Sequence, residues 1–302
     1  MIAERLDSQF RIGDRLRITE AKAGFPMVAI NTPLARAVIS VYAGQVLSYQ
    51  PHDQEADLLF LSDGAYYQPG KAIKGGVPVC WPWFGPDPDG RGRPGHGFVR
   101  NRPWTLRDVA EEQGGAITVR LGLVDTAETR EIWDHAFDLE LDVRVGTTLD
   151  MALVTRNRGG SPFSLSQGLH TYFRVGDIDR VTVTGLAGHR FIDKMDGGLE
   201  KTQDGAVTIA GEVDRIYTGV AGPLAIEDRG LGRKIAISTA GSASAVIWNP
   251  WQATAKSMAD LGDEDYRTLL CVETTNAGPD VVSVPADGEH RLSAVYEASA
   301  LS

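Results

Sequence analysis

Two residues in apolar surroundings have side chains suited to proton transfer. His170 lies in "GLHTYFRVGD", a strand-like stretch, and Glu273 ends the apolar run of "LLCVETTNAG". Imidazole titrates near neutral pH, and a desolvated glutamate has a raised pKa that suits a general base. Two alternatives stay open from the residues alone. His170 could be a packed core histidine or a metal ligand, and Glu273 could emerge into solvent at a strand end.

Other familiar reaction centres are not indicated. A zinc site needs three convergent ligands, which His96, His170 and a carboxylate could supply, but nothing in the spacing requires it. Cys80 and Cys271 match no zinc spacing and predict two buried thiols in a reducing compartment. The chain contains no GxSxG elbow, no GxGxxG after a strand and no Walker loop. We therefore expect neither a metal nor a nucleotide cofactor.

Residues 74–104 form a long segment rich in Gly, Pro and Trp with little alternation, as is typical of a functional loop. Arginine binds phosphate through two parallel donors. Basic side chains next to tryptophans thus indicate a phosphorylated ligand with an apolar face, such as a sugar ring. The alternative is a set of exposed charges that balance the nearby "DPD". The basic residues of the segment are Lys74, Arg91, Arg93, Arg100 and Arg102.

The elements that must position these residues are strands. "FDLELDVRVG" alternates apolar and charged residues, which predicts an antiparallel strand with one buried face, and residues 117–123 behave alike. "MALVTRN" follows "GTTLD", which suggests a hairpin. Many short strands, 34 glycines, 15 prolines and few helical patterns predict an all-β fold, a large antiparallel β-sandwich with few short helices. One short helical turn is expected within residues 257–270.

Bulk properties restrict the partners and the compartment. The formal net charge of −10 disfavours nucleic acid and anionic membrane surfaces. The N-terminus has no apolar signal region, and no apolar run approaches the ~18 residues of a membrane helix, so we expect a cytoplasmic protein. No linker or fixed-period repeat divides the chain, which predicts a single domain over residues 1–302.

Seven segments in this order resemble the aldose 1-epimerase superfamily, specifically its hexose-6-phosphate mutarotase branch, the glucose-6-phosphate 1-epimerases. They span residues 74–277, and the overall length is similar too. The segments are "GGVPVCWPWFGP", "HGFVRNRPW", "LHTYFRVGDI", "EVDRIY", "VIWNPW", "SMADLGDEDY" and "CVETTNA".

The resemblance implies a galactose-mutarotase-like supersandwich whose open cleft binds a pyranose and interconverts the α and β anomers of hexose 6-phosphates without metal or organic cofactor. It assigns His170 as the general acid, Glu273 as the general base and Asp214 as a ligand of sugar hydroxyls. His96 would lie beside the sugar ring. Lys74 and Arg100 would hold the phosphate or nearby oxygens. We expect His170 to be an imidazolium and Glu273 to be a carboxylate. We also expect the protein to be a monomer.

Three departures from the branch concern the preferred substrate. Lys74 stands where arginine is usual, Gly95 where glutamine can occur, and Arg174 where asparagine is common. Lysine keeps the charge but lacks the bidentate fork. Three alternatives stay open: an epimerase of unphosphorylated aldoses, a non-catalytic carbohydrate-binding module, and a glycoside-processing enzyme that pairs Asp214 with Glu273.

Overall fold

Strands dominate the computed structural model, which describes residues 1–301. The helices of this part of the chain are short: α1 (Ile2–Phe10), α2 (Ala127–Ile132) and α3 (Trp251–Ser257). None of them, nor any other helix in residues 1–301, is long and apolar enough to cross a membrane. The prediction of an all-β fold with few short helices is confirmed. Short 3₁₀ turns are η1 (Lys22–Gly24), η2 (Val99–Asn101), η3 (Ile178–Arg180), η4 (Lys194–Asp196) and η5 (Asp265–Arg267).

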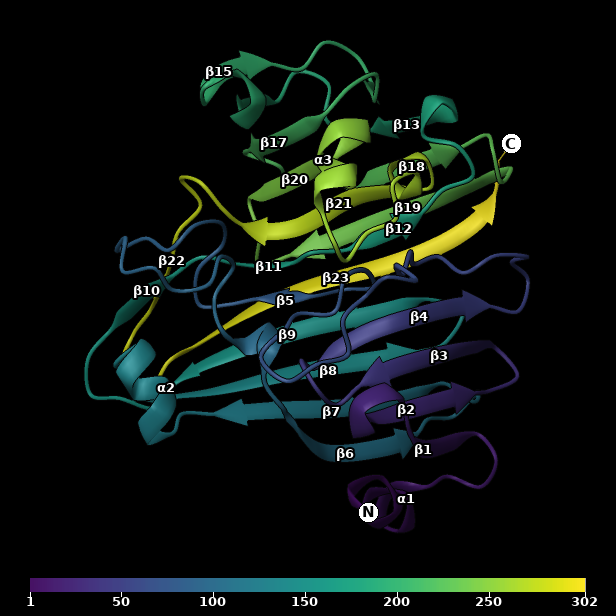
Figure 1. Ribbon diagram of the computed structural model, residues 1–302, viewed down its shortest axis with the longest axis vertical. Helices are drawn as coiled ribbons and strands as arrows, with labels where there is room; N and C mark the ends of the chain where they lie inside the picture. Colours follow the sequence, from purple (N-terminus) through teal and green to yellow (C-terminus); the bar gives the residue numbers. More distant parts are fainter. Residues whose placement is uncertain (302) are drawn as a thin grey trace.

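The largest sheet has nine antiparallel strands, and the long strand β23 runs through its middle (Figure 1). Burial alternates without a break along β8, as its apolar and charged residues predict. The expected hairpin joins β8 to β9. In spatial order the strands are β16 (Val207–Thr208), β13 (Val181–Thr184), β18 (Leu224–Asp228), β19 (Arg233–Ala240), β23 (Glu289–Ala300), β9 (Leu149–Asn157), β8 (Phe137–Val145), β7 (Ile117–Val124) and β6 (Thr105–Glu111).

A second sheet has eight strands and carries the candidate catalytic residues. Its strand β21 pairs with β20 on one side and with both β11 and β12 on the other. The strands in spatial order are β15 (Leu199–Thr202), β14 (Arg190–Asp193), β17 (Val213–Thr218), β20 (Ser244–Asn249), β21 (Leu269–Asn276), β11 (Gln167–Leu169) and β5 (Val79–Cys80), with β12 (Tyr172–Arg174) also on β21.

A four-stranded sheet and a two-stranded ribbon complete the architecture. The four-stranded sheet lies near the N-terminus, beside α1, at the lower end of the view in Figure 1. Helix α1 was not expected from the sequence; it is fixed by Asp7, whose carboxylate accepts a hydrogen bond from the Ile18 backbone N–H. These strands are β1 (Leu16–Glu20), β2 (Pro26–Asn31), β3 (Ala35–Ser40), β4 (Gln45–Pro51), β10 (Phe163–Leu165) and β22 (Val282–Val284).

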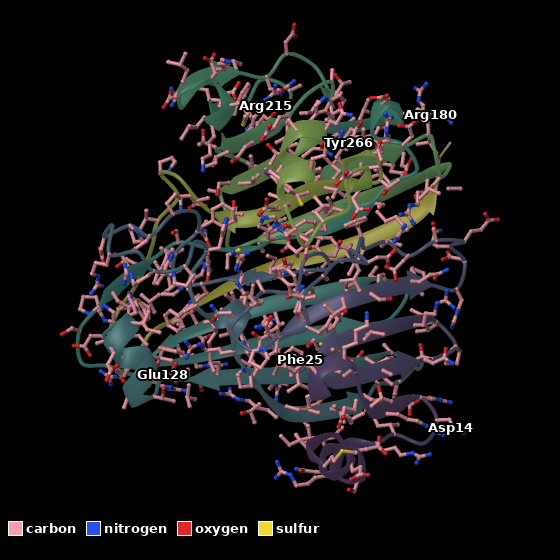
Figure 2. All side chains as sticks on the ribbon, in the orientation of Figure 1. Asp14, Phe25, Glu128, Arg180, Arg215 and Tyr266 are labelled. Carbon is pink, nitrogen blue, oxygen red and sulfur yellow. The ribbon has the colours of Figure 1, made fainter. Side chains whose placement is uncertain are left out.

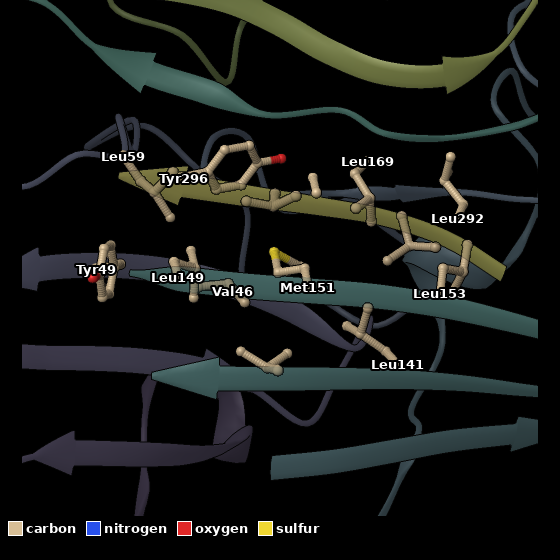
Figure 3. Packing of buried hydrophobic residues seen from close by; sticks show 14 of the residues in the cluster. Val46, Tyr49, Leu59, Leu141, Leu149, Met151, Leu153, Leu169, Leu292 and Tyr296 are labelled. Carbon is tan, nitrogen blue, oxygen red and sulfur yellow. The ribbon is translucent and has the colours of Figure 1, made fainter. Parts of the chain in front are cut away.

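The main core lies between the inner face of the nine-stranded sheet and the other sheets (Figure 3). Leu141, Met151 and Leu292 face it from the large sheet, and Val46 and Leu169 from the opposite side. One polar contact crosses this layer: the Tyr49 hydroxyl donates to the Gly146 carbonyl at 3.0 Å. Such pairing removes the cost of burying a hydroxyl group, so the layers stay in one arrangement.

Charged side chains cover the outside of the molecule (Figure 2). Glu128 on α2 and Arg180 in η3 mark opposite edges in this view, while Tyr266 packs beneath α3 against Trp251, with ring centroids 5.2 Å apart. Tyr266 belongs to the expected helical turn, which is η5. The packing fixes the chain between α3 and β21, which borders the site described next.

Candidate active site

The structure brings all six predicted site residues to one cavity of about 210 Å³ on the outer face of the eight-stranded sheet. This face is separate from the core: Leu270 and Val272 of β21 point into the main core, whereas Cys271 points into a small aromatic cluster on the other side. The lining residues from the prediction are Lys74, His96, Arg100, His170, Asp214 and Glu273. Their placement agrees with the expectation, and their roles stay predictions.

Strand register explains why His170 meets Glu273. Leu169 pairs with Thr274, and Tyr172 pairs with Cys271. Both pairs keep the same register, so His170, at the break between β11 and β12, stands opposite Glu273. Residues directly opposite each other in an antiparallel pair share a face and have Cβ atoms about 5 Å apart. The two groups are therefore neighbours by backbone pairing.

The two side chains form a close and dry pair. His170 Nδ1 lies 3.5 Å from Glu273 Oε2, and the residues are 7% and 2% exposed. Neither of these two atoms has a hydrogen-bond partner among the described residues. The imidazole ring is held by stacking on Tyr172, with centroids 4.9 Å apart, and the His170 backbone N–H donates to the Pro78 carbonyl. Two functional groups are thus oriented while their polar atoms stay available.

Burial drives both members of the pair toward their neutral forms. Desolvation lowers the pKa of His170 well below its usual value, and His96, Arg100 and Lys74 add to this. Desolvation raises the pKa of Glu273 well above its usual value, and the Asp214 carboxylate adds to the rise. Burial therefore disfavours the expected imidazolium and carboxylate. Neutral imidazole with carboxylic acid, however, holds the same number of protons as that ion pair.

The row of residues next to the pair forms an aromatic wall. Asp214 on β17 pairs with Trp248 on β20, which pairs with Cys271, which in turn pairs with Tyr172. Trp248 and Tyr172 line the cavity, and their ring centroids lie 5.9 Å apart. The wall offers apolar surface suited to a sugar face, with a carboxylate at its end. Burial raises the pKa of Asp214, while Lys194 at 3.8 Å opposes the rise.

The loop over residues 81–97 covers the cavity and presents His96. Its base is closed by a bridge between Trp81 and Gly97, where a Cβ on Gly97 would lie 1.8 Å from the Trp81 carbonyl oxygen. Only glycine fits there, and the preceding His96 adopts a left-handed conformation with φ 62°. Burial lowers the pKa of His96 to about 3, so this imidazole is neutral at physiological pH. Its ring lies 5.5 Å from that of His170.

Three cations surround the cavity but differ in their pairing. Lys74 Nζ lies 3.5 Å from an oxygen of Asp260, and Lys194 pairs with Asp214. None of the ion pairs within residues 1–301 involves Arg100, which donates to the Gly95 carbonyl at 3.1 Å. Lys74 and Arg100 also border an adjacent cavity of about 230 Å³. Arg100 is therefore the cation with the most freedom to accept an anionic group.

Several lining residues were missed from the sequence, and the structure settles one of the three departures. Lys194 lies in η4, and a single lysine in a turn carries no sequence signal. The aromatic lining of Phe84, Tyr172 and Trp248 was within recognised segments but was not assigned. Arg174 does not line this cavity in the described chain; its guanidinium lies over the Phe60 ring, 5.8 Å from the centroid.

The fold is that of a galactose-mutarotase-like β-sandwich, and its polar cleft places His170 beside Glu273. A solved structure of a provisionally named mutarotase from Salmonella typhimurium superposes with a TM-score of 0.89, at 32% identity over 96% of both chains. A galactose mutarotase-like protein from Clostridium acetobutylicum shares the fold, with a TM-score of 0.71, 14% identity, and coverage of 95% and 100% of the two chains.

Sequence comparison identifies the family. The model described as Aldose 1-epimerase matches residues 26–297, so the chain belongs to the aldose 1-epimerase family and is an isomerase. A protein from Escherichia coli K12, provisionally named glucose-6-phosphate 1-epimerase, is 39% identical over 252 residues, which are 83% of each chain. One of the same provisional name from Cenchrus ciliaris is 36% identical over 86% of this chain and 81% of its own. These matches confirm the predicted resemblance.

The burial of Glu273 predicts a cost to stability. Its folded-state pKa is raised above the unfolded value of about 4.3, so the folded protein holds this proton more tightly. Stability from this group is complete below the unfolded pKa and is lost as pH rises through the folded pKa. Glu273→Gln, neutral at every pH, should therefore unfold at a higher temperature than the wild type at pH 8.

Thermal melts from pH 4 to pH 8, in buffer with a chelator, measure this effect. The stability gain of Glu273→Gln should be smallest at pH 4 and grow with pH. A gain independent of pH, or a loss that grows with pH, would contradict the raised pKa of Glu273.

Proposed function

We propose that the chain is a glucose-6-phosphate 1-epimerase that interconverts the anomers of hexose 6-phosphates. The observation that carries the proposal is the buried pair of His170 and Glu273 in a cleft bordered by cations. His170 Nδ1 and Glu273 Oε2 lie 3.5 Å apart, and neither atom has a hydrogen-bond partner among the described residues. The provisional names of the Escherichia coli and Cenchrus ciliaris relatives support the substrate. General acid–base catalysis at a sugar needs no further group, and none is proposed.

The chemistry begins with a proton shift within the pair. Transfer of the acidic proton of Glu273 to His170 Nδ1 creates a carboxylate and an imidazolium without a change in the number of protons. The sugar and its anionic substituent enter a site that favours this separation, because polar groups in a dry cleft stabilise charge strongly. The neutral resting pair is thus the reservoir of the reactive ion pair.

Ring opening then uses both groups at once. The Glu273 carboxylate takes the proton of the anomeric hydroxyl while His170 gives a proton to the ring oxygen. The bond between C1 and the ring oxygen breaks, and C1 becomes an aldehyde. Rotation about the C1–C2 bond presents the other face, and reclosure with the roles reversed returns both protons. Each group contributes about 10²- to 10⁴-fold to a reaction of this type.

The remaining lining residues orient the sugar. Asp214 accepts hydrogen bonds from sugar hydroxyls, and the neutral His96 can donate one and accept one. Arg100, which lacks a carboxylate partner, and Lys74 hold the 6-phosphate at the boundary with the adjacent cavity. Arginine supplies the bidentate contact that Lys74 cannot.

We further infer a single domain over residues 1–302 that acts as a cytoplasmic monomer, with a hexose phosphate as its small-molecule partner and neither nucleic acid nor membrane bound. The continuous core between the sheets supports one domain. The buried, unpaired Cys80 and Cys271 support a reducing compartment.

A second candidate function is the epimerisation of unphosphorylated aldoses. Asp260 and Asp214 already neutralise Lys74 and Lys194, which favours this function because it leaves less positive charge for a phosphate. Among the described residues that line the cavity, Arg100 is then the one cation without a carboxylate partner. In that case Arg100 would have a structural role. A variant of Arg100 therefore separates the two functions.

Removal of either proton-transfer group should slow catalysis. We expect His170→Asn and Glu273→Gln each to lower kcat for glucose 6-phosphate anomer exchange by about 10²- to 10⁴-fold, because each loses its proton-transfer step. Exchange is measured by NMR saturation transfer, with the spontaneous rate subtracted. His52→Asn, a change at an exposed histidine far along the chain from the pair, is the matched control. A fully active, folded His170→Asn would disprove its role as acid.

The phosphate site is tested by Arg100→Gln. Loss of a charge-assisted contact should raise KM for glucose 6-phosphate by roughly tenfold or more and change exchange of free glucose by less than about twofold. Arg91→Gln, in the same segment of residues 74–104 but exposed and paired with Asp89, should change neither. Equal losses for both sugars would assign Arg100 to structure and favour the second candidate function.

A further inference from the structure

Three potential metal ligands converge on the floor of the cleft. His170, Cys271 and Glu273 each offer one ligand atom, and these atoms all lie within 4.8 Å of one another. The strand register produces this grouping. Cys271 and Glu273 are two residues apart on one face of β21, and His170 stands opposite Glu273 and diagonal to Cys271. Such backbone-defined proximity does not depend on a flexible loop.

Two of the three groups have unmet bonding capacity. His170 Nδ1 and Glu273 Oε2 are buried and have no hydrogen-bond partner among residues 1–301. A buried polar atom without a partner costs free energy, which a bound cation would recover. Both side chains also line the cavity, so an ion can reach them from solvent by the route that serves the sugar.

The donor set selects the kind of ion. An imidazole nitrogen, a sulfur and a carboxylate oxygen together suit zinc and other thiophilic divalent cations, whereas magnesium and calcium prefer oxygen alone. Ligand atoms around a tetrahedral zinc ion lie roughly 3.5 Å apart. The 3.5 Å separation of His170 and Glu273 already matches this value. Cys271 Sγ lies within 4.8 Å of both other ligand atoms, and its longer Zn–S bond allows a wider separation.

We propose that His170, Cys271 and Glu273 form an inhibitory site for a thiophilic divalent cation such as Zn²⁺, with the fourth position open to the cavity. Binding forms Zn–N, Zn–S and Zn–O bonds, and both the thiol proton of Cys271 and the carboxyl proton of Glu273 leave to solvent. The ion occupies the lone pairs that His170 and Glu273 need for proton transfer. It therefore inhibits in competition with the sugar and is not a cofactor of the epimerase.

Cys271 distinguishes metal binding from catalysis. It is fully buried between Trp248 and Tyr172 and is not among the residues that line the cavity, so a sugar does not contact it. The chain also offers a matched control, since Cys80 is equally buried on β5 and does not belong to the ligand group.

The experiment compares the wild type with Cys271→Ala, Cys271→Ser and Cys80→Ala under identical conditions. Inhibition of glucose 6-phosphate anomer exchange is titrated with Zn²⁺ alone, in a non-chelating buffer, after treatment with a chelator. Binding is measured independently with Co²⁺, by its thiolate-to-metal charge-transfer band in the near ultraviolet. This readout needs no turnover, so it tests the metal site even if the proposed epimerase activity fails.

We expect reversible inhibition of the wild type and of Cys80→Ala, with the Co²⁺ band present in both. Either Cys271 variant that keeps the wild-type melting profile should keep its activity without metal within about twofold, weaken Zn²⁺ inhibition at least tenfold and lose the band. Wild-type protein without the Co²⁺ band would overturn the proposal. So would a folded Cys271 variant that Zn²⁺ inhibits as strongly as the wild type.

Discussion

The central constraint on this molecule is the burial of two titratable groups side by side, with His170 Nδ1 and Glu273 Oε2 left without a hydrogen-bond partner among the described residues. Each of His170 and Glu273 loses hydration, and each responds with a pKa shifted toward its neutral form. If a flexible loop carried these side chains, it would move until they formed hydrogen bonds with water or with each other. Holding them apart at 3.5 Å and dry requires a rigid support, and the eight-stranded sheet provides it.

That support depends on the two-residue period of β21. Leu270 and Val272 anchor one face of the strand in the main core, and Glu273 with Cys271 occupies the other face. A slip of one residue would exchange the faces and place Glu273 in the hydrophobic core, at high cost. The same burial that fixes the register therefore fixes the active-site geometry. In this way the hydrophobic core and the reactive pair depend on each other through a single strand.

Much of the fold could be predicted from local pattern, as β8 shows, because its alternation is an intrinsic property of a half-buried strand. The candidate site residues were found through segments that resemble the aldose 1-epimerase superfamily, and the resemblance implied the role of each. The opposition of His170 and Glu273 could not be predicted, because it depends on pairing between strands distant in the chain. Lys194 and the opposite pKa shifts of the pair were missed for the same reason, since burial and ion pairing exist only after folding.

The central claim is that this cleft exchanges the anomers of a phosphorylated hexose. The most direct measurement is anomer exchange of glucose 6-phosphate by the wild-type protein, followed by NMR saturation transfer beside unphosphorylated glucose and galactose. The account predicts acceleration that is strongest with the 6-phosphate, because Arg100 donates to a backbone carbonyl and pairs with no carboxylate among residues 1–301. Equal or greater acceleration of the free sugars would contradict the phosphate assignment, and no acceleration of any sugar would contradict the proton-transfer role of the pair.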